Sequence, residues 1–416
     1  MLKKRQPDNL IIGLDIGSTK TCAISAVINE KVPEVIAYST KQTRGIRKGI
    51  LIDLESLSKT IISTIEEIEE KIDIPISNVF LSVPASHVNF INSSSKVNVR
   101  KKEVTEDDIS KAIESASSVQ IDNFFEKIHV IPYEFVLDNT SGILKPLGMS
   151  GTILEAKVNI LSFDSKILKN LIKCCHNANI EVDSIIIQSL ASSEAVLFKD
   201  EIENGLLFIE MGGGKTEICA FIDGFIRMIH LLPIGGNHFT QDLAIGLKIP
   251  FNEAERIKKT YHSNDNPINI EVLSKDGNIK NIEFEDIDNI LIPRAEETFS
   301  LIKDIISSWR LNERLLSTVL SGGSSQLYGL IPIAEKILEL PVRKGVVNLS
   351  NNGNSLNKAI ANFDIQELQK PEYASAIGAV NYGAEMYFAE KNRTFRQKTS
   401  RFFRSIKKVF STKKRE

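Results

Sequence analysis

The sequence predicts an α/β fold of two similar halves, with a smaller module inserted into the first half. Two glycine-rich turns indicate the duplication, since each follows an apolar strand and precedes another strand. Asp15-Ile16-Gly17-Ser18-Thr19-Lys20-Thr21 aligns with Glu210-Met211-Gly212-Gly213-Gly214-Lys215-Thr216 at an offset of 195 residues in a chain of 416. That offset is far longer than a solenoid period, so we expect two α/β halves facing each other across a cleft. Residues 85–163 are more polar and strand-rich, which indicates the inserted module.

The first half and the inserted module show a regular succession of elements. An amphipathic helix is expected over 54–70, where apolar residues recur at helical spacing. In the module, Thr105 is expected to cap one helix, and the acids that follow it suit the helix dipole. Strands are expected over 10–17, 21–28, 35–39 and 79–83 in the first half, and over 88–91, 97–99, 128–136 and 152–161 in the module.

The second half repeats the order of strand, glycine turn and strand over 206–214 and 218–222. A third glycine turn, Ser321-Gly322-Gly323-Ser324-Ser325, follows an apolar strand over 318–320. Proline suits the first turn of a helix, so a helix start is expected at Ile292-Pro293-Arg294. Helices are further expected over 294–312 and 326–338, and a surface loop over 350–370.

Composition places the chain among ordinary globular proteins. Hydrophobic residues make up 42% and charged residues 25%, which excludes a disordered or collagen-like chain. The length predicts two to three domains at ~150 residues each. No apolar run approaches the ~18 residues of a membrane-spanning helix, and no apolar segment follows the basic N-terminus as in a signal peptide. The cysteines show neither CxxC nor metal-ligand spacing, so we expect reduced thiols in a cytoplasmic protein at Cys22, Cys174, Cys175 and Cys219.

Three glycine turns after apolar strands favour a phosphate site. A single turn is weak evidence, because many hairpins need glycine where φ is positive. Neither a Walker P-loop nor a Rossmann fingerprint is present, since GxxxxGK[ST] is absent and a strand rather than a helix follows each paired turn. Small residues let backbone N–H groups approach phosphate oxygens, and an acid on each paired hairpin, Asp15 and Glu210, can position hydrated Mg²⁺. The set therefore predicts a phosphate clamp.

Over nearly its whole length the chain resembles the actin-like ATPase superfamily and, within it, the FtsA family of bacterial cell-division proteins. The paired glycine turns resemble the family's two phosphate motifs. The other matching segments are the first connecting helix at 188–193, the adenosine motif at 320–327, the second connecting helix at 371–378, and two stretches specific to FtsA at 235–244 and 253–258. The resemblance implies an actin-like, ribonuclease-H-like fold of duplicated α/β halves around a nucleotide cleft.

The resemblance also implies a division into subdomains. The insertion at 85–163 corresponds to the FtsA-type subdomain 1C in place of actin's 1B, which separates the chain from actin and from the large heat-shock chaperones. In the family, subdomain 2B takes up the C-terminal peptide of the tubulin-like protein FtsZ. The implied bounds are 1–84, 164–204 and 371–390 for 1A, 205–232 and 305–370 for 2A, 233–304 for 2B, 391–400 for a linker and 401–416 for a membrane-targeting helix.

Subdomain 2B contains one candidate partner-binding residue, Arg294, which could pair with the acids of an FtsZ peptide. A structural salt bridge to a neighbouring acid such as Glu297 is the alternative.

The resemblance implies ATP and Mg²⁺ as ligands and a role for each motif. Asp15 resembles the metal-positioning acid, and Glu210 would act on the metal through water. Gln188 falls where relatives keep the residue that orients the attacking water; a helix-start residue without catalytic duty is the alternative. Glu255 and Lys258, one helical turn apart, would reach the ribose and base, or else form an exposed salt bridge. The remaining contacts are Gly17, Ser18, Thr19 and Lys20 on one side of the phosphates, Gly212, Gly213, Gly214, Lys215 and Thr216 on the other, and Gly322, Gly323 and Ser324 at the adenosine.

One position departs from the family pattern. The second phosphate motif usually holds aspartate where this chain has Glu210. The extra methylene moves the carboxylate by ~1 Å, a displacement that can cost ~100-fold in a preorganised site. We therefore expect ATP–Mg²⁺ binding with slow or absent hydrolysis.

The C-terminal segment has a charge opposite to that of the rest of the chain. Residues 391–416 carry eleven Lys or Arg and one acid, which leaves about −12 on residues 1–390. A core-packed helix has no use for this charge, and nucleic acid would not explain three phenylalanines on one face, so an interfacial membrane helix is favoured. The apolar stripe is Phe402, Phe403, Ile406, Val409 and Phe410, and the basic residues around it are Arg401, Arg404, Lys407 and Lys408.

Together these features favour a membrane-tethering adaptor that binds ATP and polymerises like actin. Its partners would be FtsZ, further copies of itself, other divisome proteins and the anionic cytoplasmic face of the cell membrane at the division septum. Two alternatives stay open. A sugar or acetate kinase of the same superfamily would need a catalytic acid outside the glycine turns, and we find no candidate. The pilus adaptor PilM is also actin-like but typically lacks such a tail.

Overall fold

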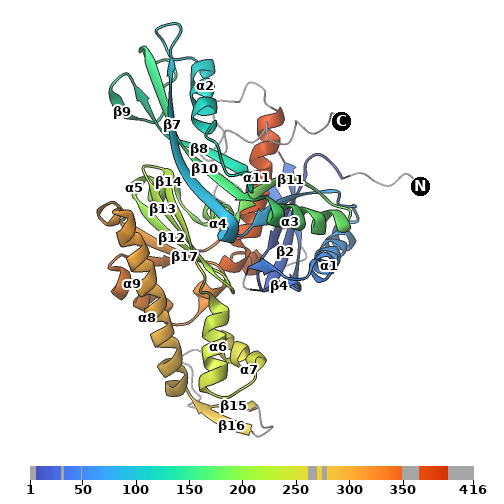
Figure 1. Cartoon of the computed structure of the whole chain (residues 1–416). Helices are drawn as coiled ribbons and strands as arrows, with labels where there is room; N and C mark the ends of the chain where they lie inside the picture. Colours follow the sequence, from blue (N-terminus) through green and yellow to red (C-terminus); the bar gives the residue numbers. More distant parts are fainter. Residues whose placement is uncertain are drawn as a thin grey trace, which may run out of the picture. The chain divides into compact units, whose positions relative to one another are not determined.

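The structure is a computed structural model that describes residues 6–29, 32–47, 49–260, 269–273, 279–348 and 365–391. These residues form two compact units (Figure 1). The larger unit takes its described residues from Met1–Ala85, Cys174–Asp223 and Met228–Ala384, and the smaller unit from Ser86–Lys173, Gly224–Arg227 and Glu385–Glu416. The predicted membrane helix at 401–416 lies outside the described residues, as do residues 349–364 of the predicted surface loop.

The first sheet of the larger unit has β1 (Leu10–Ile16) at its centre. Every residue of β1 is buried, as its largely apolar sequence predicts, and the buried residues include Asp15. β1 is antiparallel to β2 and parallel to β6, and helix α1 (Leu54–Ile72) begins at Asp53, whose carboxylate accepts the N–H groups of Glu55 and Ser56. In order across the sheet the strands are β11 (Glu181–Ile187), β6 (Asn78–Val83), β1, β2 (Lys20–Asn29) and β3 (Val32–Gln42), with the short pair β4 (Ile46–Arg47) and β5 (Ile50–Leu51) separate from it.

The second sheet of the larger unit repeats the first. Its order is β14 (Phe225–Leu232), β13 (Thr216–Ile222), β12 (Leu206–Met211), β17 (Ser317–Ser321) and β18 (Val342–Lys344). β12 is antiparallel to β13 and parallel to β17, as β1 is to β2 and β6. Even the register agrees, because Asp15 pairs with Cys22 and Glu210 pairs with Glu217. The predicted duplication at an offset of 195 residues is therefore confirmed.

Two helices meet between the paired sheets at a glycine. α4 (Gln188–Val196) follows β11, and α11 (Ala374–Lys391) follows the 3₁₀ turn η4 (Pro371–Tyr373). A Cβ atom at Gly378 would lie 1.8 Å from the carbonyl oxygen of Ala191, so no larger residue fits where these two helices pack. The other short helices are α3 (Ser165–Asn177), α5 (Lys199–Asn204), α9 (Leu330–Leu338) and α10 (Ile365–Leu368), with 3₁₀ turns η1 (Ala85–His87), η2 (Asn312–Arg314) and η3 (Gly323–Gln326).

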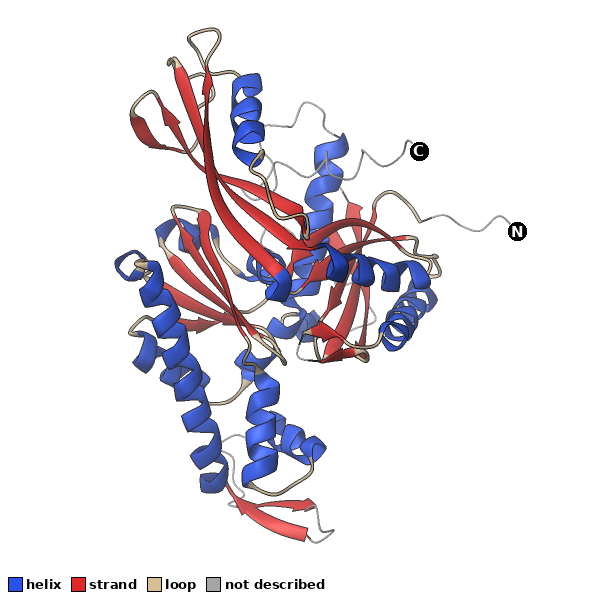
Figure 2. Cartoon of the chain, in the orientation of Figure 1, coloured by secondary structure: helices blue, strands red, loops and turns tan. Residues whose placement is uncertain are grey.

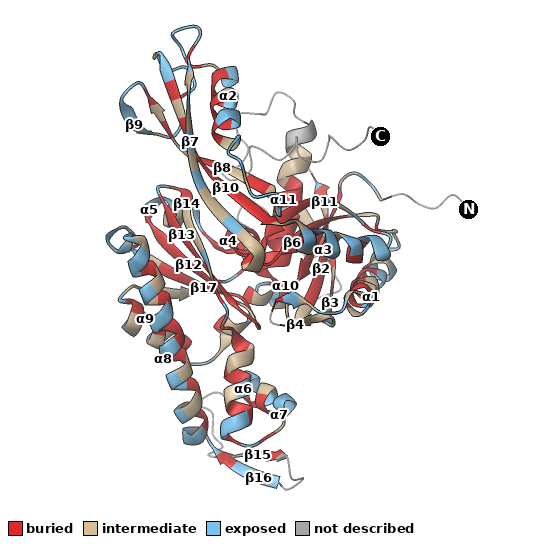
Figure 3. Cartoon of the chain, viewed as in Figure 1, coloured by how far each residue is buried: buried red, intermediate tan, exposed pale blue. Residues whose placement is uncertain are grey.

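A helical extension follows β14 in the second half (Figure 2). It contains α6 (Gly236–Gly246), α7 (Phe251–Thr260), the hairpin of β15 (Asn269–Leu273) and β16 (Ile279–Glu283), and α8 (Phe284–Trp309). Buried and exposed residues alternate along α8 (Figure 3).

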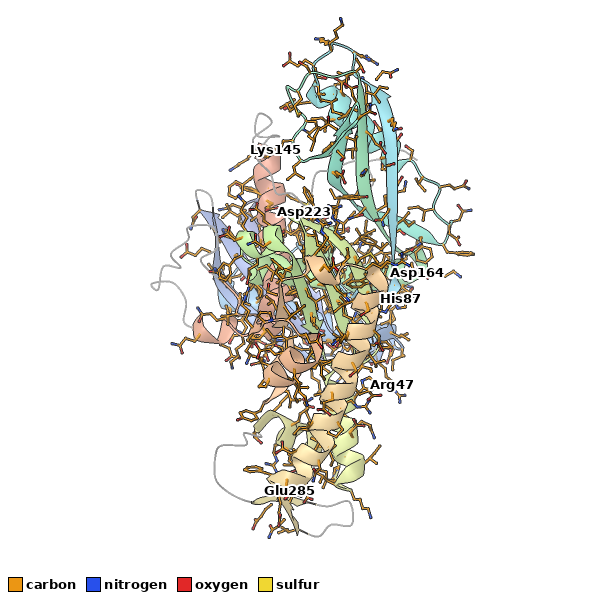
Figure 4. The ribbon with its side chains drawn as sticks, turned by 90° about the vertical axis from the view of Figure 1, so that its left-hand side faces the viewer. Arg47, His87, Lys145, Asp164, Asp223 and Glu285 are labelled. Atoms are coloured by element: carbon orange, nitrogen blue, oxygen red, sulfur yellow. The ribbon has the colours of Figure 1, made fainter. Side chains whose placement is uncertain are left out.

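The helix start predicted at Ile292-Pro293-Arg294 is wrong. α8 begins at Phe284, and Glu285, labelled in Figure 4, lies in its first turn. Pro293 lies inside the helix, where it removes one backbone donor. The buried stripe continues across the proline, and its burial outweighs the lost hydrogen bond; its members are Ile287, Leu291, Ala295, Phe299 and Ile302.

The smaller unit contains the predicted insertion. Its sheet has the order β7 (Val88–Asn98), β10 (Ile153–Asp164), β8 (Phe125–Leu137) and β9 (Thr140–Ile143), all antiparallel neighbours. Thr105 caps α2 (Glu106–Ser117) through a reciprocal bond with Asp108, so that prediction is confirmed. β7 is one strand where two were predicted; it pairs with β10 without interruption up to Val88, beside His87 in Figure 4. The serines in the middle of β7 interrupt the apolar sequence pattern, but the backbone pairing with β10 continues through them.

Among the described residues, no helix is both long enough and apolar enough to cross a membrane. All four cysteines are buried.

Candidate functional site

The two paired glycine turns share one geometry and meet at their tips. Gly17 N–H donates to the carbonyl oxygen of Lys20 at 2.9 Å, and Gly212 N–H donates to that of Lys215 at the same distance. A Cβ atom at Gly213 would lie 2.4 Å from Cγ2 of Thr19, so the second turn packs against the first only because it has no side chain there. The structure therefore brings the two predicted phosphate motifs together.

The third glycine turn joins the second. Ser324 Oγ donates to the carbonyl oxygen of Gly212 at 2.9 Å. Gly322 has φ of +83°, and a Cβ atom there would also lie 2.5 Å from the carbonyl oxygen of Met211. Glycine is needed at that position both for its conformation and for its space.

The start of α6 completes this cluster of turns. Gly236 N–H donates to Gly212 O at 3.0 Å, and Asn237 N–H donates to Gly213 O at 2.7 Å. A Cβ atom at Gly236 would lie 2.2 Å from Ser324 Oγ and 3.3 Å from Lys258 Nζ. The sequence segment that begins at Gly235 thus packs directly on the second and third glycine turns.

Glu255 and Lys258 lie on α7 and face α6. Their side chains form an ion pair of 2.6 Å, and Lys258 Nζ also donates to Gly236 O at 3.0 Å and Thr240 Oγ1 at 2.8 Å. The exposed fractions of the two side chains are 28% and 11%, so the pair is largely covered. Burial raises the pKa of Glu255, but the charge of Lys258 and the hydrogen bonds from Lys258 and Thr240 together outweigh burial and hold this pKa below its ordinary value. A role at the ribose and base stays a prediction.

Asp15 is a buried carboxyl at the end of β1. Its Oδ1 accepts from Gln188 Nε2 at 2.7 Å and from Ser375 Oγ at 2.9 Å, and Ser375 shares a further bond of 2.6 Å with Ser82. Burial raises the pKa of Asp15, and the bonds from Gln188 and Ser375 oppose that rise. Both connecting helices therefore contribute a donor to Asp15, because Gln188 begins α4 and Ser375 lies in the first turn of α11.

Gln188 uses its amide nitrogen within the protein. Besides the bond to Asp15, Nε2 lies 3.3 Å from the carbonyl oxygen of Ile16. Its amide oxygen is the atom left to accept a hydrogen bond from a water molecule. Whether Gln188 orients an attacking water stays a prediction.

Lys20 points toward the second connecting segment. Its ammonium donates to the carbonyl oxygen of Glu372 at 2.9 Å, lies 3.4 Å from the carboxylate of the same residue, and sits 3.9 Å from the ring centroid of Tyr373. Gln326 Nε2 donates to the other carboxylate oxygen of Glu372 at 2.9 Å. Glu372 thus links the first and third glycine turns, a role that the sequence analysis missed although the residue lies in a matched segment.

Glu217 is a second residue that the sequence analysis missed. Its carboxylate is buried and accepts the N–H groups of Ala85 at 2.7 Å and Ser189 at 3.1 Å. Lys215 Nζ lies 3.2 Å from the same carboxylate. The available sequence signal was an acid in the strand Thr216–Ile222, which is otherwise apolar after its first residue.

Glu210 lies opposite Glu217 in the β12–β13 ladder. Burial raises its pKa from 4.5 to about 8, with the nearby charge of Glu217 acting in the same direction. The carboxyl is therefore largely protonated at neutral pH, and a protonated acid is a weak ligand for Mg²⁺. Asp15 fits the metal better, since Mg²⁺ in nucleotide sites often uses one or two carboxylates together with phosphate oxygens and water. Within the described ranges, no group of three or more His, Cys, Asp or Glu side chains could hold a metal ion.

The buried carboxyl of Glu210 predicts a pH dependence of stability. Because its pKa is higher in the folded protein, the folded state holds a proton that the unfolded state releases between pH 4.5 and about 8. Stability should therefore fall as pH rises through this window, and Glu210→Gln should remove that component. In metal-free buffer, the melting temperature of the parent is expected to fall relative to Glu210→Gln from pH 5 to pH 8.

The exposed Glu313→Gln serves as the control for this pH series, and its melting curve should follow the parent throughout. If the difference between the parent and Glu210→Gln does not change with pH, the buried carboxyl is already ionised at pH 5, and the assignment is wrong.

Arg294 lies on α8 and is paired within the protein. Its guanidinium donates to both carboxylate oxygens of Asp242 on α6, at 2.5 and 3.1 Å, and to Glu297 one turn further along α8. Contact between Arg294 and a partner stays a prediction, and it would require an acid of the partner to replace Asp242 or Glu297. The predicted membrane residues Phe402, Phe403, Ile406, Val409, Phe410, Arg401, Arg404, Lys407 and Lys408 lie outside the described residues.

Two solved structures resemble the fold. PilM in a PilM–PilN type IV pilus biogenesis complex aligns with a TM-score of 0.64 at 16% identity, covering 91% of this chain and 99% of that one. MreB5 of Spiroplasma citri, bound to ADP, aligns with a TM-score of 0.54 at 14% identity, covering 93% and 100%. At these identities the likeness concerns the fold alone, and it confirms the predicted actin-like α/β architecture.

Sequence relatives identify the family. The family described as "Cell division protein FtsA" matches residues 207–378, and "SHS2 domain inserted in FTSA" matches residues 85–162. The cell division protein FtsA of Pseudomonas aeruginosa is 31% identical over 388 residues, which cover 91% of this chain and 90% of that protein. The chain therefore belongs to the FtsA family of cell division proteins.

Proposed function

We propose that this cell-division protein binds ATP with Mg²⁺ and connects FtsZ filaments to the cytoplasmic face of the cell membrane at the septum. The observation that carries the nucleotide part is the meeting of three glycine turns and the start of α6 beside the buried Asp15. Backbone groups at such turns bind anions without competing side chains. The MreB5 neighbour bound to ADP supports the same choice of ligand.

The proposed binding residues contact two parts of the nucleotide, the phosphates and the adenosine. The turns at Gly17–Lys20 and Gly212–Thr216 take the phosphates, and Gly322, Gly323 and Ser324 lie on the adenosine side with Glu255 and Lys258. Asp15 holds the hydrated metal, which supplies positive charge to the phosphate oxygens. Hydrolysis is slow or absent, because Glu210 replaces the usual aspartate and its extra methylene displaces the carboxyl from the position that the family uses.

The membrane part rests on the sequence of residues 401–416, an amphipathic basic segment. Such a helix lies in the interface rather than across the bilayer, so the protein is peripheral. Self-assembly into actin-like filaments places many such helices on one surface, and multivalency then strengthens weak individual binding. A small-molecule kinase and a pilus adaptor are not favoured by any observation beyond the shared fold.

The partner part concerns the expected subdomain 2B, residues 233–304, which takes in most of the helical extension. Several large apolar side chains are exposed there, among them Ile245 on α6, Phe251 on α7 and Ile292 on α8, with exposed fractions of 62%, 42% and 40%. Exposed apolar residues together with a charged anchor suit an amphipathic peptide. Arg294 is the proposed anchor, exchanging Asp242 for an acid of the FtsZ C-terminal peptide.

Arg294→Gln is expected to weaken binding of the FtsZ C-terminal peptide ~5- to 10-fold, because one charge-assisted pair is lost at a partly exposed position. Fluorescence anisotropy of a labelled peptide measures this directly. Arg256→Gln is the matched control, since Arg256 forms a similar pair with Glu253 on α7. Equal dissociation constants for the parent, Arg294→Gln and Arg256→Gln would show that Arg294 is not part of the binding surface. A parent that does not bind the peptide would show that the extension is not the peptide-binding site.

A further inference from the structure

We propose that the ammonium group of Lys215 is a fixed cation of the nucleotide site that replaces part of the charge of Mg²⁺, so that ATP binding depends only weakly on the metal. The inference rests on the proposed nucleotide-binding function and adds to it a property of one residue.

The first observation is a difference between two equivalent lysines. Lys20 and Lys215 close the first and second glycine turns, and each offers its carbonyl oxygen to the glycine three residues earlier at 2.9 Å. The side chain of Lys20 is satisfied by Glu372 and by the ring of Tyr373. Position 22, two residues beyond Lys20, holds cysteine, whereas the equivalent position in the second hairpin holds Glu217. This acid pairs with the Lys215 ammonium in a buried environment.

The second observation is that the Lys215 ammonium is short of partners. Its side chain is only 9% exposed, and the carboxylate of Glu217 lies 3.2 Å away. Within the part of the chain that the structure describes, Nζ has no hydrogen-bond partner apart from this carboxylate. The oxygens of Glu217 already accept two backbone N–H groups, from Ala85 and Ser189. A buried ammonium has three protons to place, and leaving them without acceptors is costly.

The third observation is the charge around it. The carboxyls of Asp15 and Glu210, like that of Glu217, lie close enough to act electrostatically on Lys215. A triphosphate at the glycine turns would meet these acids and be repelled by the ionised ones. In many nucleotide sites Mg²⁺ relieves such repulsion. Burial lowers the pKa of Lys215, and the charge of Glu217 opposes that fall. The ammonium form places one positive charge beside the second turn, in surroundings where charges interact more strongly than in water. Phosphate oxygens are acceptors of the kind that the ammonium lacks.

The test compares ATP binding with and without Mg²⁺, first for the parent and then for Lys215→Met. ATP binding by the full-length protein is titrated by calorimetry in millimolar Mg²⁺ and again in excess EDTA. For the parent, the dissociation constant for ATP is expected to rise less than ~5-fold on chelation. For Lys215→Met, the affinity for ATP in EDTA is expected to fall ~10- to 100-fold, the effect of losing a hydrogen bond to a charged group. Added Mg²⁺ should restore most of the binding of Lys215→Met.

Controls separate charge from folding. Lys215→Arg keeps the charge and should keep the weak metal dependence, and the exposed Lys336→Met should behave as the parent. If Lys215→Met fails to fold because Glu217 is left unpaired, Lys215→Met combined with Glu217→Gln removes both charges and takes its place. A parent that loses ATP binding entirely in EDTA overturns the inference while the proposed function stands. So does a Lys215→Met protein, alone or combined with Glu217→Gln, that has the metal dependence of the parent. A parent that binds no ATP in either buffer overturns the proposed function itself.

Discussion

Gly213→Asp is expected to abolish ATP binding. Two effects act together in this variant. A Cβ atom at position 213 would lie 2.4 Å from Thr19 Cγ2 and 3.0 Å from its Oγ1, so the Thr19 side chain or the turns themselves must shift. The carboxylate then adds a negative charge where the phosphates are proposed to lie, and like charges in a water-poor site repel strongly. Titration with a fluorescent ATP analogue should show no saturation in the concentration range that saturates the parent.

Two controls separate the effects in this variant. Gly213→Ala introduces the steric conflict without the charge and should weaken binding without abolishing it. Asn204→Asp adds the same charge at an exposed position of the larger unit and should bind as the parent does. A Gly213→Asp protein that titrates like the parent would show that no phosphate lies at this turn.

Loss of the C-terminal segment is expected to abolish membrane binding while leaving the folded body and its ATP binding intact. The stripe of apolar residues supplies insertion at up to ~1–3 kcal/mol for each buried Phe or Ile, and each nearby basic residue adds ~1 kcal/mol of attraction to anionic lipid. Truncation after Glu390 removes both contributions. Phe403→Glu places a charge in the centre of the stripe and repels the leaflet. Co-sedimentation with vesicles rich in anionic lipid should be lost in both variants.

A matched control places the same charge on the opposite side of the segment. In a helix, Ser411 lies about 140° around the axis from the centre of the apolar stripe, so Ser411→Glu loses some attraction but no apolar burial, and should retain binding. The parent should be released only partly by high salt, since salt screens the charges but not the apolar contribution. Complete release of the parent would indicate a purely electrostatic contact, and vesicle binding by the truncated chain would place the contact elsewhere.

Local patterns explain what the sequence predicted correctly. The duplication is visible because a glycine turn between two apolar strands needs only about seven consecutive residues to be recognised, and it occurs twice. The cap at Thr105 is visible because both of its partners lie within one turn of helix. The same reasoning failed at Pro293, where the apolar stripe of α8 outweighs a local rule about where proline belongs.

The residues that were missed act through contacts distant in the sequence. Glu217 reaches Ala85 across 132 positions, and Lys20 reaches Glu372 across 352. No periodic pattern connects such pairs, because the fold rather than the local sequence brings them together. The pairing of Arg294 with Asp242, 52 positions apart, could therefore not be read from residue spacing. For Glu217, the sequence offered only an acid within an otherwise apolar strand, and that pattern does not identify the residues that the acid contacts.

Recruitment of FtsZ polymers to vesicles tests the proposed function most directly. FtsZ filaments are mixed with anionic vesicles in the presence of full-length protein, of the chain truncated after Glu390, or of no added protein, and the vesicles are then floated on a density gradient. We expect FtsZ to float with the vesicles only when the full-length protein is present. Flotation of FtsZ in equal amounts with the truncated chain, or no flotation with the full-length protein, would contradict a role in connecting FtsZ to the membrane.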